Sequence, residues 1–404
     1  MQARSFWATL FSKKPFVLVI GSAHIDVFGD FPSSLRTQID REGEVFCSIG
    51  GSGFNIAVDL ANERMVSVAL FTHIRGRSPV SDVILARLLE EKVSTQYVVQ
   101  DKQIQRDSGF VAHRADGELV SAVSSMPVED ADFNTMRLES AICKASVVVA
   151  DCNLSASQLT LIAGLCAEHQ RRFIVSGVSE SKCKRVQLLS SGSNSRTPIA
   201  CFCINRKESR ALMDKNSNPE DPEFAKTICQ VARAEHVVVT GGKDGWVVYS
   251  SDGTSQKFEA PRARAVVSSS GAGDAVVAAI ANYAALHDHL EWPLIKTTVH
   301  RFVDHVLRKR VSSGTDLTSL ETLALSQRSL ARYLSQPKIK IGALAMAIVA
   351  ALGLLAGLIQ AAVSLETSKV IWPRLKKTYC WVSPGSAYCA TERVPGDKMP
   401  PEFK

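Results

Sequence analysis

The arrangement of apolar residues restricts the fold of this chain more than any other feature of its sequence. Short runs that are apolar throughout, such as 16–20, 146–150 and 199–204, are typical of strands buried on both faces of a parallel sheet. Stretches with helical spacing, such as 55–62 and 157–171, lie between successive runs. The alternation predicts an α/β fold with a doubly wound, mainly parallel sheet flanked by helices.

Two neighbouring segments depart from this alternation. Residues 108–112 and 118–123 both have strand patterns, and they flank the turn sequence Ala115-Asp116-Gly117. We expect a hairpin over about 106–125, in a small sheet of its own.

Residues 341–365 are 25 residues without any Asp, Glu, Lys or Arg. As a helix they would measure about 37 Å, enough to cross a hydrocarbon core of about 30 Å. Lys338 and Lys340 precede the segment, and Lys369 and Trp372 follow it, as interfacial residues do. The segment predicts a transmembrane helix; a buried core helix is the alternative.

The 404 residues carry a formal net charge of +7, most of it in one region. Residues 338–404 contain nine Lys and Arg against four Asp and Glu, whereas residues 1–337 contain 38 against 36. Because the larger part has no concentrated basic stripe, we expect no nucleic-acid partner. The positive charge flanks the apolar segment instead, which favours contact with a lipid bilayer.

Eight of the ten cysteines precede residue 230, and none of them forms a C-x-x-C pair. Their irregular spacing predicts reduced, mostly buried thiols rather than a zinc site. Cys380 and Cys389 follow the apolar segment and could pair if that side is oxidising.

Residues 269–274 (SSGAGD) precede an apolar helical stretch over 275–280. A glycine-rich turn at the start of a helix presents unpaired N–H groups, and the helix dipole adds positive potential, so the turn can bind a phosphate. A carboxylate at such a site, here Asp274, can accept the proton of an attacking hydroxyl. The alternative is a tight turn whose Asp only complements the dipole.

Two more glycine-rich segments occur near the N-terminus. Residues 50–55 (GGSGFN) let a ligand approach the backbone, and Asn55 offers both a donor and an acceptor. Residues 21–26 (GSAHID) place Asp26 at the carboxyl end of the first strand, where α/β sheets bind ligands and a carboxylate could hold sugar hydroxyls. An ordinary turn and a turn-capping Asp are the alternatives.

Two polar segments follow later strands. Asn205 and Glu208 are three residues apart and could organise water around Mg²⁺, although a helix cap with an acidic third residue is an equally simple interpretation. Residues 240–245 (TGGKDG) form a loop compatible with nucleotide contact.

Taken in order, GSAHID, GGSGFN, the hairpin, NRKE, TGGKDG and SSGAGD resemble the ribokinase-like family, also called the PfkB carbohydrate kinases, over about residues 16–325. The resemblance implies an α/β fold with a small β lid. It also implies ATP with Mg²⁺, and phosphorylation of a sugar or nucleoside hydroxyl.

The resemblance assigns roles residue by residue. Asp274 would be the catalytic base, in an anion hole formed by Gly271, Ala272 and Gly273. The substrate would be held by Asp26, Gly50, Gly51 and Asn55. The nucleotide would be bound by Asn205, Glu208, Thr240, Gly242 and Gly245, with Asn205 and Glu208 also serving Mg²⁺ through water.

Residues 113–123 (HRADGELVSAV), followed by Met126-Pro127, resemble the lid hairpin of the pseudouridine kinase branch. Adenosine, ribose and fructose phosphate remain alternative substrates. The sequence departs from the family pattern at Ser268 and Ser269, where Asp or Asn and then Thr are usual, and at His24, where Asn is usual. In the region that lines the adenine pocket of relatives, the chain has large and charged residues: His300, Arg301, Asp304, His305, Arg308 and Lys309.

These observations predict five parts: an N-terminal extension (1–15), a kinase domain (16–325), a linker (326–340), a transmembrane helix (341–365) and a tail (366–404). One hypothesis is an active, single-pass membrane kinase whose domain faces the cytoplasm, where ATP is available. The other is a degenerate kinase fold that acts as a membrane-tethered sensor or scaffold. Because relatives dimerise through the lid, a homodimer is also an expectation.

Overall fold

The computed structural model describes all of the chain except residues 1–13, 38–39, 117, 190–198, 214–218, 220–222, 263–265, 267, 310–378, 384–385 and 391–404. The chain divides into two compact units, Met1–Leu330 and Ala331–Lys404.

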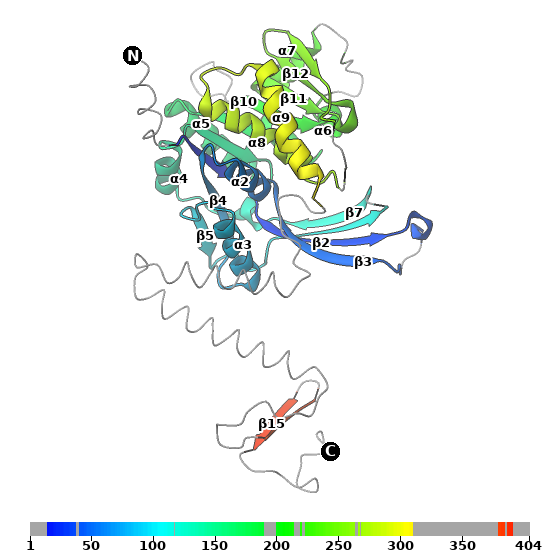
Figure 1. The fold of residues 1–404 in the computed structure, drawn as a ribbon. Coiled ribbons are helices and arrows are strands. Elements are labelled where there is room, and N and C mark those ends of the chain that lie inside the picture. Colours follow the sequence, from blue (N-terminus) through cyan, green and yellow to red (C-terminus); the bar gives the residue numbers. More distant parts are fainter. Residues whose placement is uncertain are drawn as a thin grey trace, which may run out of the picture. The chain divides into compact units, whose positions relative to one another are not determined.

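The larger unit is built on a nine-stranded sheet with the order β13-β12-β11-β10-β9-β8-β1-β4-β5 (Figure 1). The strands are β1 (Phe16–Ile20), β4 (Ser67–Arg75), β5 (Val98–Asp101), β8 (Val147–Asp151), β9 (Arg172–Ser176), β10 (Ile199–Asn205), β11 (Ala234–Thr240), β12 (Trp246–Ser250) and β13 (Ser255–Phe258). All neighbours pair in parallel except β12, which pairs antiparallel with both β11 and β13. The predicted mainly parallel sheet is confirmed.

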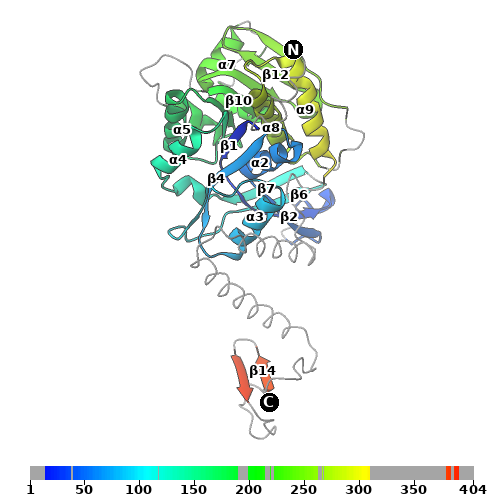
Figure 2. The same ribbon diagram turned by 60° about the vertical axis from the view of Figure 1, so that its left-hand side comes forward.

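Helices cover both faces of this sheet (Figure 2). One face packs against α2 (Ser52–Glu63), α3 (Pro79–Glu90), α8 (Ala272–Leu286) and α9 (Trp292–Leu307). The other face packs against α4 (Thr135–Ile142), α5 (Ala156–Glu168), α6 (Arg206–Leu212) and α7 (Phe224–Ala232). Short 3₁₀ segments are η1 (Ser33–Leu35), η2 (Pro127–Asp130), η3 (Cys183–Leu188) and η4 (Gly242–Asp244). Because central strands such as β1 and β8 are buried on both faces, their sequences are apolar, except for the Asp151 that ends β8.

A second sheet of four strands, which we call the lid, has the order β3-β2-β6-β7. The predicted hairpin is present as β6 (Gly109–Ala115) and β7 (Glu118–Ser125). The lid also contains β2 (His24–Phe31) and β3 (Glu44–Gly50), so the segment from 24 onward is not a turn at the end of β1, as expected, but a strand. The alternating pattern of β2 was missed because polar His24 and Asp26 occupy its buried positions.

Within the smaller unit the structure describes an antiparallel pair, β14 (Tyr379–Ser383) and β15 (Ser386–Ala390), in which Cys380 lies opposite Cys389. No helix among the described residues is long and apolar enough to cross a membrane. The predicted transmembrane segment 341–365 lies outside the described residues and stays a prediction.

Candidate active site

The N-terminus of α8 is the centre of the candidate site. Gly271 precedes the helix with φ +80°, a left-handed conformation that favours glycine, and the helix begins at Ala272. The amide of Ala275 donates to the Gly271 carbonyl, which closes the first turn. No atom lies within 4 Å of a Cβ placed on Gly273. The start of the helix therefore faces open space, as a phosphate site requires.

Asp274 lies in this first turn and is half-buried. Its Oδ1 accepts a hydrogen bond from Ser52 Oγ at 2.5 Å, and its Oδ2 accepts one from Asn55 Nδ2 at 2.9 Å. Burial raises the pKa of Asp274 from 3.8 to about 6, while the hydrogen bonds from Ser52 and Asn55 oppose the rise. A carboxylate with this pKa is ionised at neutral pH and is a better proton acceptor than an ordinary Asp.

A second carboxylate, Asp151 at the end of β8, was not predicted. Its Oδ2 accepts from the amide and hydroxyl of Ser22 and from the amide of Gly53, at 2.8–3.0 Å, and its Oδ1 accepts from the amide of Asn153 at 2.9 Å. Asp151 is 0% exposed. It joins the ends of β1 and β8 to the first turn of α2, which carries Ser52 and Asn55. The available signal was an acidic residue that ends a wholly apolar strand.

Asp26 lies on β2 of the lid, and His24 Nε2 lies 2.9 Å from Asp26 Oδ1. Gly50, the last residue of β3, is paired with His24; a Cβ there would come within 2.0 Å of Asp26 Oδ2. Glycine at 50 therefore makes room for the Asp26 carboxylate. Gly51 follows with φ +106° and is the N-cap of α2. Gly50, Gly51 and Asn55 therefore lie along one continuous segment, and strand pairing brings Asp26 beside it.

Asn205 and Glu208 form a capping box at the start of α6, the second of the two interpretations given above. Asn205 donates through its amide and its side chain to the two Glu208 oxygens, at 2.9 and 2.8 Å. Glu208 is buried, and burial raises its pKa. Asn205 ends β10 and Glu208 follows it, one strand along the sheet from the end of β9.

The predicted nucleotide residues Thr240, Gly242 and Gly245 lie where β11 leads through η4 into β12. Gly242 and Gly245 have φ of +60° and +85°, and no atom lies within 4 Å of a Cβ placed on Gly242. Arg206 and Asp244 form an exposed ion pair beside this loop. The loop presents exposed backbone at the same edge of the sheet as Asn205.

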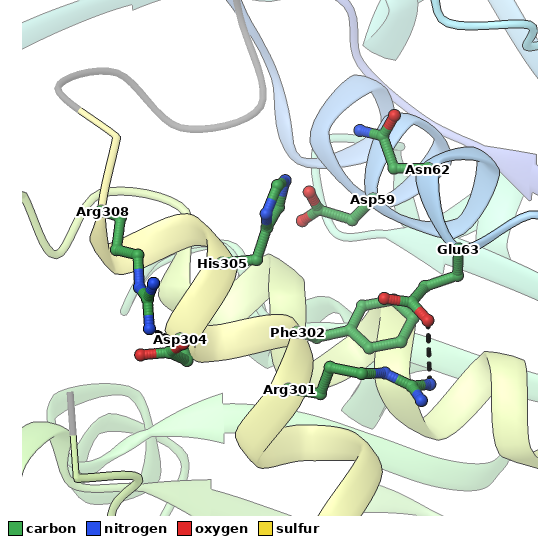
Figure 3. A pocket seen from close by; sticks show the side chains of 8 residues that line it. All are labelled: Asp59, Asn62, Glu63, Arg301, Phe302, Asp304, His305 and Arg308. Carbon is green, nitrogen blue, oxygen red and sulfur yellow. Dashed lines mark hydrogen bonds and ion pairs between the residues drawn. The ribbon is translucent and has the colours of Figure 1, made fainter. Parts of the chain in front are cut away.

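The charged residues of α9 line a cavity between α2 and α9, about 390 Å³ in volume (Figure 3). It is lined by Asp59, Asn62, Glu63, Arg301, Phe302, Asp304, His305 and Arg308. Arg301 pairs with Glu63 of α2 at 2.9 Å, and Arg308 pairs with Asp304 one turn earlier on α9. His300 lies outside this cavity, where its Nε2 is 3.0 Å from the Glu259 carbonyl oxygen. One of these charges, Arg301, thus joins α9 to α2, and the Arg308–Asp304 pair lies within α9.

The comparisons with known proteins agree with this arrangement. A family model described as pfkB family carbohydrate kinase matches residues 14–292. Pseudouridine kinase of Escherichia coli (strain K12) is 27% identical over 277 residues, which are 67% of this chain and 84% of that protein. Ribokinase of Mus musculus is 24% identical over 284 residues, which are 68% and 83% of the two chains. Arabidopsis thaliana ribokinase, solved with ribose and ATP, has a TM-score of 0.59 at 17% identity and covers 78% of this chain and 99% of its own.

The α/β sheet, the lid and the turn before α8 define a ribokinase-like fold. The chain belongs to the pfkB family of carbohydrate kinases, since the family model matches more than half of its length. It is accordingly a phosphotransferase that acts on a hydroxyl group.

Proposed function

We propose that this protein transfers the terminal phosphoryl group of ATP to a hydroxyl of a nucleoside or sugar, with Asp274 as the general base. The observation that carries the proposal is the half-buried Asp274 at the open start of α8, with a pKa raised to about 6. Asp274 accepts the proton of the attacking hydroxyl. Ser52 and Asn55 hold its two oxygens in place.

The start of α8 stabilises the charge of the transferred group. The amides in the first turn of a helix have no partner within the helix, and the dipole favours an anion there. Gly271, Ala272 and Gly273 thus form the anion hole. Asp26 and Asn55, supported by Gly50 and Gly51, position the acceptor, which gives the hydroxyl its orientation for in-line attack.

The residues after β10 and β11 suit ATP and Mg²⁺. Glu208 and Asn205 supply oxygen atoms of the kind that Mg²⁺ binds through water. The loop that contains Thr240, Gly242 and Gly245 offers the nucleotide an exposed backbone at Gly242. When bound, Mg²⁺ neutralises charge on the phosphates. Asn205 also fixes the orientation of the Glu208 carboxylate through its two hydrogen bonds.

Pseudouridine is the acceptor that we propose first. The lid sequence over 113–123 resembles pseudouridine kinases, and one such enzyme is 27% identical. The partly buried Phe110 ring lies 6.3 Å from the His24 ring and is paired in register with Asp26, so an aromatic surface adjoins the proposed sugar site. A planar base can pack against such a surface.

The test is a transfer assay on the full chain with Mg-ATP and a panel of pseudouridine, uridine, adenosine, ribose and fructose 6-phosphate. We expect turnover to be fastest with pseudouridine. Binding of an acceptor without any turnover would favour the sensor hypothesis, and turnover only with a sugar phosphate would reject the proposed substrate class.

We also propose that residues 341–365 anchor the protein in a membrane, with the kinase domain on the cytoplasmic side. The support for the anchor is the uncharged 25-residue sequence with basic flanks. The support for the cytoplasmic side is the proposed use of ATP. Alkaline extraction of membranes should leave the full chain in the pellet. An impermeant maleimide should label Cys380 or Cys389 in intact cells, after reduction, if the tail lies outside; extraction into the supernatant would contradict the anchor.

A homodimer through the outer face of the lid is our last proposal on assembly. Val45, Val111 and Val123 are exposed on the face of the lid opposite to Asp26. Exposed apolar groups on one face mark association surfaces. Light scattering should report a dimer that Val111→Asp with Val123→Asp converts to a monomer; a monomeric parent chain would reject it.

A further inference from the structure

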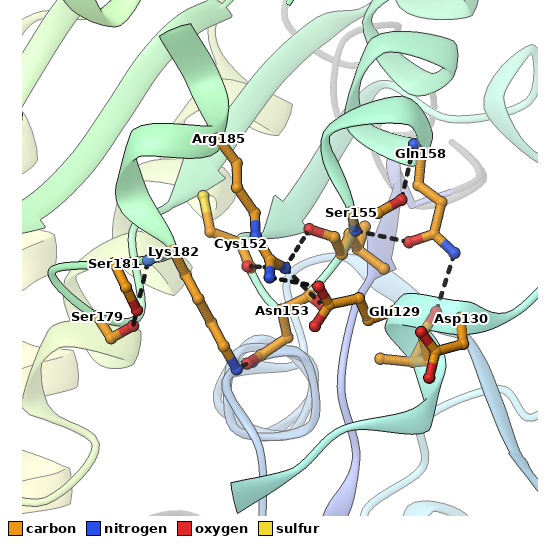
Figure 4. Close-up of polar contacts among 12 residues, drawn as sticks. Glu129, Asp130, Cys152, Asn153, Ser155, Gln158, Ser179, Ser181, Lys182 and Arg185 are labelled. Carbon is orange, nitrogen blue, oxygen red and sulfur yellow. Dashed lines mark hydrogen bonds and ion pairs between the residues drawn. The ribbon is translucent and has the colours of Figure 1, made fainter. Parts of the chain in front are cut away.

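Lys182 lies in the loop between β9 and η3, at the same edge of the sheet as the active site, and no motif in the sequence singles it out. Its side chain is half-buried, and Nζ donates to Asn153 Oδ1 at 2.7 Å (Figure 4). The neighbouring Lys184, in contrast, is exposed. Lys182 is thus held inward at one defined position.

The partner of Lys182 is itself firmly held. Asn153 is 2% exposed, and its Nδ2 donates to Ser22 Oγ at 2.8 Å; Ser22 Oγ in turn donates to Asp151. Asp151 accepts from the amide of Gly53, in the turn of α2 that holds Asp274. A continuous set of hydrogen bonds therefore connects Lys182 to the residues around the proposed base.

Lys182 is not needed to hold the segment 152–154. Arg185 donates to the backbone carbonyls of Cys152, Asn153 and Leu154 and pairs with Glu129, as Figure 4 shows in part. The backbone of this segment is already fixed by those bonds. A purely structural role thus gives little reason for a half-buried lysine beside it.

Lys182 follows β9, in the middle of the sheet, and it is the direction of its side-chain hydrogen bond that favours the acceptor over the nucleotide. Its hydrogen bonds lead to the ends of β8 and β1, which we call the acceptor side together with Asp26 on β2. The proposed nucleotide residues follow β10 and β11, which we call the nucleotide side. Strand β9 separates the two.

An ammonium group has three N–H donors. Among the residues that the structure describes, the one hydrogen-bond acceptor of the Lys182 ammonium group is Asn153 Oδ1. Removing donors from water without replacing their partners is costly, so a half-buried lysine with free donors favours a ligand that accepts hydrogen bonds. Sugar hydroxyls and base carbonyls both supply such oxygen atoms.

We propose that Lys182, positioned by Asn153, binds the phosphoryl acceptor by donating a hydrogen bond to one of its oxygen atoms. The inference rests on the proposed function only in taking that acceptor to be a nucleoside or sugar. Lys182 then provides a cation that binds the substrate on the acceptor side, in addition to the carboxylate of Asp26.

The direct test compares Lys182→Met with Lys184→Met as the matched control, in the full chain. For Lys182→Met we expect KM for the acceptor to rise about 10- to 100-fold, the range for losing a hydrogen bond from a charged donor. KM for ATP and the unfolding temperature should not change. Lys184→Met should behave like the parent chain. An unchanged acceptor KM for Lys182→Met, or an equal rise in KM for ATP, would overturn the proposal.

Running the assay with pseudouridine and with ribose distinguishes the two sources of oxygen. A loss confined to pseudouridine identifies a carbonyl of the base, and an equal loss with ribose identifies a sugar hydroxyl. If the parent chain transfers no phosphate, the proposed function fails, and calorimetric titration with each acceptor still tests Lys182. Equal affinity of parent and Lys182→Met, or no binding to the parent, then rejects the role of Lys182.

The pH dependence supplies a measurement that a structural role would not affect. Burial lowers the pKa of Lys182, Arg185 lowers it further, and Asp151, Glu129 and Cys152 act in the opposite direction. Acceptor affinity should fall as the pH rises through this lowered pKa. Lys182→Arg, which stays charged, should remove the fall. A fall that persists in Lys182→Met would contradict the assignment.

Discussion

The acceptor side and the nucleotide side of the site differ in how their residues are held. On the acceptor side Ser22, Asp151 and Asn153 are at most 2% exposed and bonded to one another. On the nucleotide side Asn205, Gly242 and Asp244 are exposed. The acceptor side thus relies on several buried side chains, whereas the nucleotide side combines an exposed loop backbone with one buried side chain, Glu208. Substitutions on the acceptor side should therefore change stability and substrate preference, whereas substitutions of exposed residues on the nucleotide side should change them little.

Asp274 lies where the two sides meet, and its replacement should have the largest effect. Asp274→Asn should lower kcat by about 10²- to 10⁴-fold, the usual contribution of a general base. KM for ATP should change little. Asp82→Asn, at a carboxylate of α3 that plays no part in the site, is the control. Retention of most of kcat in Asp274→Asn would remove Asp274 from the chemistry.

The same substitution should stabilise the fold. The folded state raises the pKa of Asp274 from 3.8 to about 6, so it binds more protons than the unfolded state, and stability falls as the pH rises through that interval. At pH 7 Asp274 is ionised in the folded state, and this ionisation lowers the free energy of unfolding by about 1–3 kcal/mol. In denaturant unfolding at pH 7, Asp274→Asn should have a free energy of unfolding higher than the parent chain by this amount. At pH 4 the two chains should differ little.

The next effect is on the acceptor side. Asp151→Ala leaves the buried amides of Ser22, Gly53 and Asn153 without their acceptor, so we expect the free energy of unfolding to fall by about 2–4 kcal/mol. Asp151→Asn keeps the shape of the side chain and one acceptor oxygen, so its free energy of unfolding should fall less than that of Asp151→Ala. A loss no greater than that of a nucleotide-side variant would contradict the distinction between the two sides.

Removing the hydrogen bond from Ser52 to Asp274 should have a smaller effect, on the pH dependence of the reaction. Ser52→Ala removes a hydrogen bond that lowers the pKa of Asp274. The acid limb of kcat/KM should therefore move to higher pH, by about one unit if the bond is worth about 1.5 kcal/mol. Ser176→Ala, which touches Ser52 but not Asp274, is the matched control. An unshifted limb would show that Ser52 does not tune the base.

The smallest effect is expected on the nucleotide side. Asp244→Asn breaks an exposed ion pair with Arg206. Because exposed pairs contribute little, the unfolding temperature should be unchanged and KM for ATP should change less than about twofold. A marked loss of stability would show that this exposed ion pair helps to hold the nucleotide-side loop.

Much of the fold could be predicted from sequence because the central strands are buried on both faces and therefore apolar throughout. Strands β2 and β3 could not be predicted, because the buried residues His24, Asp26 and Ser48 are polar and interrupt the alternation of apolar and polar residues. The glycine-rich turn before α8 was visible because it depends on local backbone conformation.

The remaining site residues depend on contacts between distant segments. Asp151 meets Ser22 across 129 residues and Gly53 across 98, and Lys182 reaches Asn153 across 29. No local spacing encodes such contacts. Two residues of α2 hold Asp274. The sequence predicts a substrate role for Asn55 and no role for Ser52, because only the tertiary structure brings α2 to α8.

The most direct test of the account is the pH profile of kcat/KM for phosphoryl transfer by the full chain. We predict an acid limb with an apparent pKa of about 6, below which the rate falls tenfold per pH unit as Asp274 is protonated. The residual rate of Asp274→Asn should lack this limb. A parent profile that is flat from pH 5 to 8, or a limb that persists in Asp274→Asn, would contradict Asp274 as the base.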